Sequence, residues 1–182
     1  QMSNVYDSEN DKINVTVDVR NALNVKDLNL NLFTVVLENG IATTQQNGFS
    51  SVTDPDLGEW GAGGKYAQSF AQIVMDHVAR GAYGNTFLGT AGLIPSTLSS
   101  DRFYTANYTI NMPAQVNNPE NVDVVVMLIN ANTGEVLNSI IAPINGKSVE
   151  MSGVEGVFTE AAGDALIYTA NGNVHVAAEG KL

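Results

Sequence analysis

The chain has 182 residues, of which 44% are hydrophobic, so it is long enough for one domain with a buried core, with or without a small appendage. Aspartate and glutamate number 19 against 8 lysines and arginines, and the formal net charge is -11. A surface this acidic repels phosphate groups, which excludes nucleic acid as an expected partner. There is no cysteine, so disulfides, thiol catalysis and thiolate metal sites are excluded.

The sequence also argues against a membrane-spanning chain. No run approaches the roughly 18 apolar residues that a spanning helix needs. The first residues, Gln1–Asp11, are polar and acidic and do not resemble a signal peptide. Because the sequence does not begin with Met, we expect a mature or trimmed product whose leader or lipid anchor would lie upstream.

The first predicted elements are two β-strands. Apolar and polar residues alternate over 13–19, which is typical of a strand with one face in solvent. Leucine and asparagine alternate over 28–32, and the apolar positions then change phase at Phe33, which indicates either a bulge or a second covered face. Asn39-Gly40 ends this run and predicts a tight reversal of the chain.

The middle of the chain contains two predicted loops and one ambiguous segment. Asp54–Lys65 is rich in glycine and acidic residues, and Gly84–Ser100 has little pattern, so both are predicted as loops. Ser69–Ala82 fits the period of a helix, but it can also be a strand. We predict a strand, because a sandwich built from the flanking strands needs another one here.

Three further strands follow. Tyr104–Met112 alternates, and Val122–Ile129 is apolar on both faces, as a central strand would be. Asn130–Glu135 predicts a hairpin turn in which Gly134 supplies the positive φ, and Val136–Ala142 returns as the partner strand.

The character of the chain changes after Pro143. Val154–Thr159 and Ala165–Thr169 are short apolar runs, and the Asn171-Gly172 dipeptide predicts a hairpin turn. The whole pattern predicts an all-β fold, an immunoglobulin-like Greek-key β-sandwich over 1–144 with a small C-terminal β appendage over 145–182.

The residues that could carry chemistry do not form a recognisable catalytic set. His77 and His175 are the only histidines, and neither has a second ligand at the spacing of a zinc site. No nucleophile elbow and no phosphate-binding loop is present. We therefore predict a protein that is not an enzyme and that holds no metal and no cofactor.

Two acidic clusters, over 7–11 and over 54–59, keep alternatives open. Carboxylates in a loop suit Ca²⁺, but the spacing of a calcium loop is missing, and such clusters arise by composition in an acidic chain. The rival hypothesis is an enzyme in which Asp54 or Asp56 works with Glu59 as a carboxylate pair.

The candidate ligand-binding residues are aromatic. Trp60, Tyr66, Tyr83 and Phe87 lie in or beside the long loops over 54–66 and 83–103, and Phe103 ends the second loop. Aromatic residues on loops anchor protein or glycan contacts. We expect both loops at one end of the sandwich; the alternative is that the rings only plug its open end.

Two motifs suggest a family. They are the turn Glu38-Asn39-Gly40-Ile41, with Gln45 or Gln46 and Gly48 after it, and the run His77-Val78-Ala79-Arg80, with Gly84–Gly89 after it. With the hairpin over 130–136 they resemble the Omp28-related outer membrane protein family of Bacteroidetes over residues ~28–142. Arg80 is placed to pair with Glu38 on neighbouring strands, as a surface pair that contributes only ~0–1 kcal/mol.

This resemblance implies a location and a class of function. It implies a cell-envelope protein, in the periplasm or at the outer membrane and cell surface of a Gram-negative bacterium. It further implies a thioredoxin-like domain before the sandwich and a sorting-type domain that begins near Val154. We expect a non-catalytic binding or structural module whose partner is an envelope protein or peptide, with a glycan as an alternative. The rival hypothesis is an accessory domain of a larger enzyme or redox protein.

Overall fold

Antiparallel β-strands make up most of the computed structural model, which describes residues 1–84, 86–100, 102–147, 165–170 and 173–178. The chain divides into two compact units, Gln1–Val149 and Glu150–Leu182. The predicted all-β fold is confirmed.

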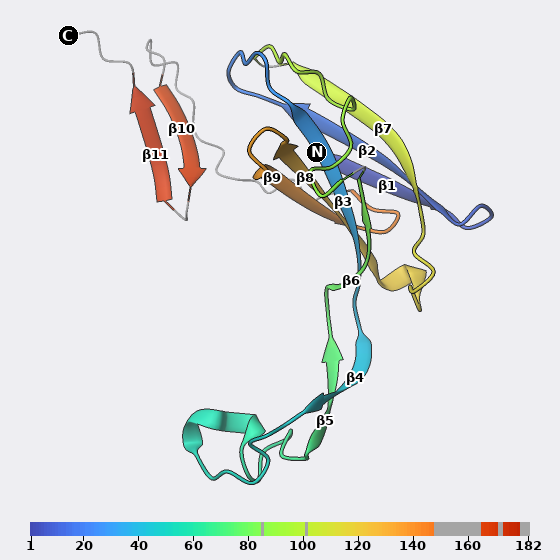
Figure 1. Cartoon of the computed structure of the whole chain (residues 1–182), viewed down its shortest axis with the longest axis vertical. Helices are drawn as coiled ribbons and strands as arrows, with labels where there is room; N and C mark the ends of the chain where they lie inside the picture. The colour runs from blue at the N-terminus through green and yellow to red at the C-terminus, as the bar shows by residue number, and fades with distance from the viewer. Residues whose placement is uncertain (85, 101, 148–164, 171–172, 179–182) are drawn as a thin grey trace. The chain divides into compact units, whose positions relative to one another are not determined.

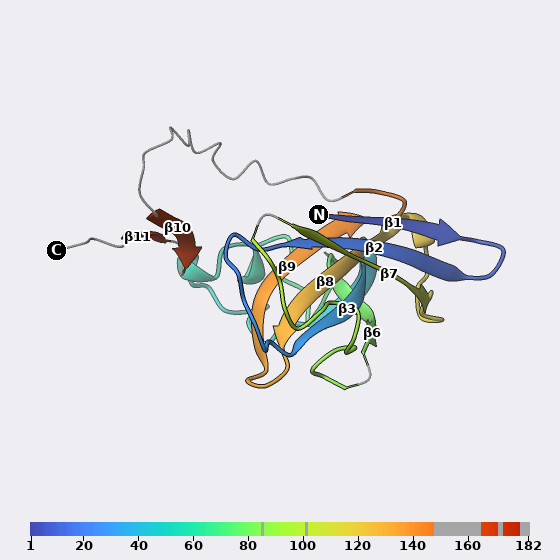
Figure 2. The same cartoon turned by 90° about the horizontal axis from the view of Figure 1, so that it is seen from above.

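The first unit contains two antiparallel sheets that form a sandwich, seen as two layers in Figure 2. The first sheet has the order β1-β2-β7, with β1 at Met2–Asp7, β2 at Lys12–Arg20 and β7 at Phe103–Asn111. The second has the order β6-β3-β8-β9, with β3 at Leu30–Glu38, β6 at Val78–Tyr83, β8 at Val122–Asn130 and β9 at Glu135–Pro143. These orders correspond to strands A, B and E and strands C′, C, F and G of an immunoglobulin-like sandwich.

The core lies between the two sheets and comes from the alternating residues of β2, β3 and β8. Its fully buried members include Ile13, Val15, Leu32, Val36, Val122, Val124 and Val126. The β8 strand is central, between β3 and β9, which explains why both of its faces are apolar. The predicted hairpin after β8 is also confirmed, because Gly134 has φ 76° and its amide donates to the Asn130 carbonyl at 2.8 Å.

The phase change in β3 reflects a second covered face. Leu32, Thr34 and Val36 are all buried on the core face, so two polar positions, Thr34 and Glu38, point inward with the apolar ones. Phe33 on the other face is half-buried. The bulge lies further along the strand, where the pairing of β3 with β6 shifts between Val36 and Leu37.

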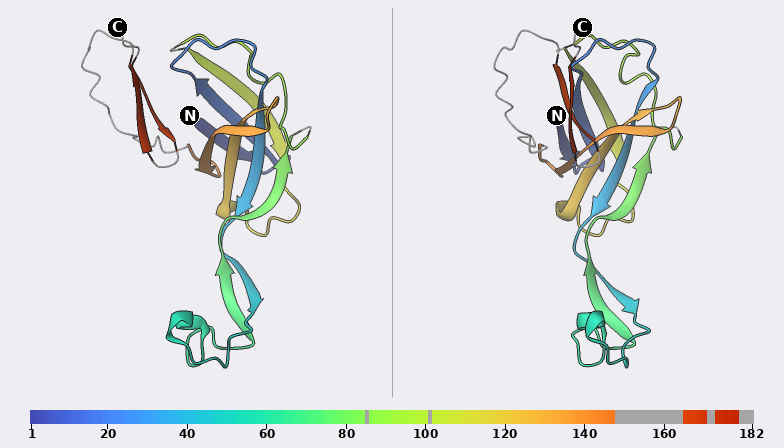
Figure 3. Two further views of the ribbon diagram at one scale, coloured as in Figure 1. Left: turned by 60° about the vertical axis from the view of Figure 1, so that its left-hand side comes forward. Right: turned by 90° about the vertical axis from the view of Figure 1, so that its left-hand side faces the viewer.

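The predicted reversal at Asn39-Gly40 is wrong. The chain continues past Gly40 into β4 (Ile41–Gln46), passes through the 3-10 helix η1 (Pro55–Trp60) and returns along β5 (Phe70–Met75) into β6. We call residues 41–76 the arm. In Figures 1 and 3 the arm extends away from the two sheets of this unit.

Two residues with positive φ separate the arm from the sandwich. Gly40 has φ 74° between β3 and β4, and His77 has φ 56° between β5 and β6. Glycine adopts this conformation without strain, whereas a histidine rarely does. Both strands therefore change direction at the same level, and the predicted strand over Ser69–Ala82 is confirmed as two strands with this break between them.

Two strands are described in the second unit. They are β10 (Ala165–Ala170) and β11 (Asn173–Ala178), which pair antiparallel with Tyr168 opposite His175. The predicted run Val154–Thr159 and the predicted turn Asn171-Gly172 lie outside the described residues. A sorting-type domain stays a prediction.

A search of the described residues for a helix with the length and apolar character of a membrane span finds none.

Candidate functional site

A buried ion pair lies in the sandwich, on the two strands from which the arm departs. Glu38, at the end of β3, is 1% exposed, and its carboxylate accepts a hydrogen bond from Arg80 Nε at 2.7 Å. The other carboxylate oxygen accepts from the backbone amides of Asn117 at 2.9 Å and Asn118 at 2.7 Å. The Arg80 side chain is 17% exposed, so the predicted pair exists, but its expected place on the surface is wrong. The pair is buried because the β3–β6 bulge turns Arg80 toward Glu38.

The surroundings of Glu38 keep it ionised. Burial raises the pKa of this carboxyl, but the hydrogen bonds from the Asn118 and Asn117 amides and from Arg80 outweigh that effect. The net result is a pKa below the ordinary value of 4.5. At neutral pH the sandwich therefore holds a buried carboxylate beside the arm, and its hydrogen bonds join β3, β6 and the segment before β8.

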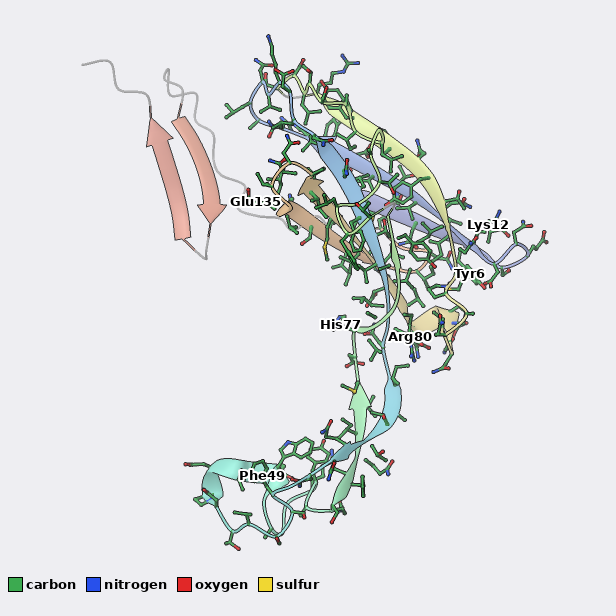
Figure 4. All side chains as sticks on the ribbon, viewed as in Figure 1. Tyr6, Lys12, Phe49, His77, Arg80 and Glu135 are labelled. Atoms are coloured by element: carbon green, nitrogen blue, oxygen red, sulfur yellow. The ribbon has the colours of Figure 1, made fainter. Side chains whose placement is uncertain are left out.

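Next to this ion pair, hydrogen bonds connect the residues where β3 passes into β4 and β5 passes into β6. Asn39 Oδ1 accepts from the His77 amide at 2.8 Å, and Asn39 Nδ2 donates to Asp123 at 2.6 Å. Asp76 accepts from the Gly40 amide at 2.9 Å. The exposed His77 imidazole lies 3.9 Å from Asp123, and Asp76 bonds to backbone, so neither residue orients the other. Figure 4 shows His77 and Arg80 where the arm leaves the sandwich.

Asn47 organises the tip of the arm. This buried side chain donates to the carbonyls of Trp60 at 2.8 Å and Tyr66 at 2.7 Å and accepts from the amide of Phe49 at 2.8 Å. One amide group thus satisfies three backbone groups of the loop between β4 and β5. Sequence reasoning missed this residue, although an asparagine before Gly48 at the end of a strand is a turn signal.

Trp60 and Tyr66 are brought together at this tip. Their ring centroids are 4.9 Å apart with planes tilted by 32°, and Lys65 Nζ lies 5.0 Å from the Tyr66 centroid. The Lys65 amide donates to Glu59 Oε2 at 2.9 Å. Both aromatic rings are half-buried, so the pair shapes the tip and still offers part of its surface to solvent.

The other two candidate residues lie on the sandwich. Tyr83 is on β6, and its hydroxyl donates to the Asn111 carbonyl at 2.5 Å. Phe87 is 92% exposed in the loop after β6, and this loop pairs with β3 through the bridge of Thr90 with Leu32. Our expectation that both long loops meet at one end is wrong, because the arm carries the Trp60 loop away from the sheets. A ligand-binding role for any of the four stays a prediction.

The acidic clusters serve as local caps. Asp7 accepts from the amides of Glu9 and Asn10, and Asp54 caps η1 by accepting from the Asp56 amide at 3.0 Å. Within the described ranges, no group of three or more histidine, cysteine or acidic residues could hold a metal ion.

The arm also exposes apolar residues that the sequence did not single out. The members are Phe49, Val52, Phe70, Val74 and Met75. Figure 4 shows Phe49 at the far end of the arm. Exposed apolar groups on a projecting element mark a candidate contact surface.

Comparisons with known proteins give one family match and one similar solved structure. Residues 1–147 match the family described as outer membrane protein Omp28, which covers the sandwich and the arm. No curated protein matches the chain. The solved structure of HBP35 of Porphyromonas gingivalis is similar, with 14% identity and a TM-score of 0.47, over 100% of this chain and 51% of that chain. The chain thus spans about half the length of that protein. The match over 1–147 shows that this chain belongs to the Omp28 outer membrane protein family, and this family places it in the cell envelope.

Proposed function

We propose that this chain is a non-catalytic binding module of an envelope protein and that the arm is its recognition surface. The observation that carries this proposal is that none of the described residues in the hydrophobic core cluster belongs to the arm. Ordering a segment of this length costs roughly 1–2 kcal/mol per residue in backbone entropy. An ordered segment that adds nothing to the core is better explained by binding than by folding.

The construction of the arm supports this reading. A two-stranded ribbon is marginally stable in water, yet the two ends of this one are held together by the bond from the Gly40 amide to Asp76, next to the buried Glu38–Arg80 pair of the sandwich. Its tip is closed by Asn47. A surface held on a rigid support loses less entropy on binding than a flexible one. The half-buried Trp60 and Tyr66 rings are suitable anchors for a partner.

A non-catalytic role is supported by how the polar groups of the arm are used. His77 has no nucleophile as a hydrogen-bond partner in the described part of the chain, and its imidazole lies beside the Asp123 carboxylate. Asp54 and Glu59, the rival carboxylates, each accept from a backbone amide. The other function class, an accessory domain of a larger enzyme or redox protein, is compatible with the same arm. An upstream domain in the gene would favour it.

The test is removal of the arm. In the full chain, Ile41–Met75 is replaced by an Asn-Gly turn, which connects Gly40 to Asp76 at the point where these two residues already bond. We expect the far-UV circular dichroism and the thermal midpoint of the sandwich to be retained. Saturable binding to envelope proteins of the producing bacterium, measured on a sensor surface, should be lost.

A second variant guards against misfolding of the shortened chain. Trp60→Ala with Tyr66→Ala keeps the arm and removes the aromatic anchors, and it should weaken the same binding by about tenfold or more. Full binding by the chain without its arm would contradict the proposal. A turnover that His77→Ala abolishes would contradict its non-catalytic part.

A further inference from the structure

The ribbon of the arm differs in charge from the rest of this acidic chain. Neither β4 (IATTQQ) nor β5 (FAQIVM) contains a charged residue, a proline or a glycine. Proteins usually protect exposed edge strands with such residues, because an open edge pairs with strands of other chains. The arm has an unprotected edge where a binding function is proposed.

The register shows which backbone groups of β5 point outward. The backbone N–H of Asn47 donates to the Ser69 carbonyl at 2.9 Å. Hydrogen-bonded pairs recur at every second residue of an antiparallel ladder, so Gln45–Ala71 and Thr43–Ile73 are hydrogen-bonded pairs too. The intervening residues of β5 turn their N–H and C=O groups away from β4. They are Phe70, Gln72 and Val74. Among the described residues β5 pairs with β4 alone.

The side chains indicate that β5 is the binding edge. Phe70 is 63% exposed and Val74 67% exposed, and they lie on one face with the exposed Gln72. The opposite edge of the ribbon, on β4, is more polar, and the Gln46 carbonyl there already accepts from Gln45 Nε2 at 3.2 Å. An added strand therefore gains more apolar contact beside β5 than beside β4.

The charges around β5 indicate the chemistry of the partner. Acidic residues lie at both ends of the strand, with Asp54, Asp56 and Glu59 in the tip and Asp76 at the base, whereas Lys65 is the only basic residue of the arm. A partner strand with basic ends complements this arrangement. A second copy of this chain would bring the same acidic ends and be repelled.

We propose that β5 binds an extended segment of a partner protein as an added strand, and that this segment is apolar in its centre and carries lysine or arginine at both ends. This inference rests on the proposed binding function and states how the partner binds, namely by strand addition. Main-chain hydrogen bonds supply affinity in this mode, and the alternating side chains supply specificity.

The experiment uses the full chain and two synthetic peptides. Both have the centre Val-Thr-Val-Thr-Val; one carries two lysines at each end and the other two glutamates. We expect the lysine peptide to bind at least about tenfold more tightly at low ionic strength, and the difference to shrink in high salt. Hydrogen exchange should show new protection of the outward amides of Phe70, Gln72 and Val74, with little change at Ala71 and Ile73, which already bond to β4.

The variant Gln72→Pro removes one outward N–H without breaking the ribbon, because edge strands tolerate proline where the N–H faces solvent. Thr44→Pro, on the opposite edge, is the matched control, since Thr44 is paired with Gln72. We expect Gln72→Pro to weaken lysine-peptide binding about tenfold or more and Thr44→Pro to leave it within about twofold.

Equal binding by the wild type and Gln72→Pro, or protection centred on β4, would overturn the strand-addition inference. A dimer that Gln72→Pro dissociates, measured by sedimentation, would overturn the stated partner in favour of a second copy. If the chain without its arm loses envelope binding while Gln72→Pro keeps it, the proposed function stands and this inference fails. If the shortened chain still binds, the proposed function itself fails.

Discussion

Thr34 and Glu38 are two polar side chains on the core face of β3, and each is satisfied by a residue distant in sequence. Thr34 Oγ1 lies 2.7 Å from the Tyr108 hydroxyl, which joins β3 of one sheet to β7 of the other. Burial raises the pKa of Tyr108 to about 12, with the Thr34 hydrogen bond acting in the opposite direction. Glu38 is satisfied by Arg80 and two backbone amides.

Tyr108→Phe should lower the free energy of unfolding by about 1–3 kcal/mol, because it leaves the buried Thr34 hydroxyl without a partner. Adding Thr34→Val should restore most of that loss, since both polar groups are then gone. Urea denaturation of the two single variants and the double variant measures this as a cycle. Additive losses would show that the two hydroxyls are not coupled.

Glu38→Gln should lower the free energy of unfolding by about 2 kcal/mol at neutral pH, because it weakens the charged hydrogen bonds from Arg80 and the two amides. Since folding lowers the pKa of Glu38, its stabilisation is present above pH 4.5 and is lost as the pH falls through the lower folded pKa. The difference between wild type and variant should therefore narrow in urea titrations from pH 7 to pH 3. Glu120→Gln, at an exposed position, serves as the control. If the difference in unfolding free energy between wild type and Glu38→Gln is the same at pH 3 as at pH 7, Glu38 does not stabilise the fold as a charged carboxylate.

At the scale of the element, the arm depends on its two ends. Its base is fixed by the bonds that connect Asn39, Gly40, Asp76 and His77, and its tip by Asn47. Gly64 packs against the backbone of Glu59 so closely that a Cβ atom would not fit, so the tip is a specific turn rather than a loose glycine-rich loop.

Asn47→Asp should open the tip, because an isosteric carboxylate replaces the donor to the Trp60 and Tyr66 carbonyls with an acceptor. Trp60 is the only tryptophan in the chain, so its fluorescence reports this region alone. We expect a red-shifted emission without loss of the far-UV signal of the sandwich. Gln46→Glu, an exposed amide-to-acid change at the preceding residue, should leave the emission in place. An unchanged spectrum in Asn47→Asp would remove Asn47 as the organiser of the tip.

At the scale of the whole molecule, the sandwich and the arm of the first unit have separate sources of stability. The sandwich has a core between two sheets, whereas the arm relies on hydrogen bonds and one aromatic pair. Local stability follows buried apolar contact, so segments that lack it open first.

The Trp60 fluorescence transition should therefore occur at a lower urea concentration than the far-UV circular dichroism transition of the same sample. Native-state hydrogen exchange should likewise show faster opening of β4 and β5 amides than of β3 and β8 amides. Coincident transitions by both probes would mean that the arm and the sandwich unfold as one cooperative unit.

The strands were predictable from the sequence because the alternation of apolar and polar residues matches the alternation of buried and exposed side chains in the structure. The period-two pattern of β2 and the apolar run of β8 both correspond to strands with Val15 and Val124 in the core. The break at His77 was not predictable, since a positive φ at histidine has no local signal. The Glu38–Arg80 pair was predicted for the case that the strands carrying the two motifs are neighbours, but its burial depends on the bulge in the β3–β6 pairing.

The sequence by itself determined the all-β class, the hairpin at Gly134, the family and the acidic surface, because each of these follows from local pattern or composition. Only the tertiary structure decided that the chain continues past Asn39-Gly40 into an arm instead of reversing there. It also decided that Trp60 and Tyr66 lie on this arm while Phe87 lies on the sandwich, and that β5 has an open edge. The physical reason is that strand pairing joins residues such as Gln45 and Ala71 across a loop, and no local propensity encodes which partner a strand will have or lack.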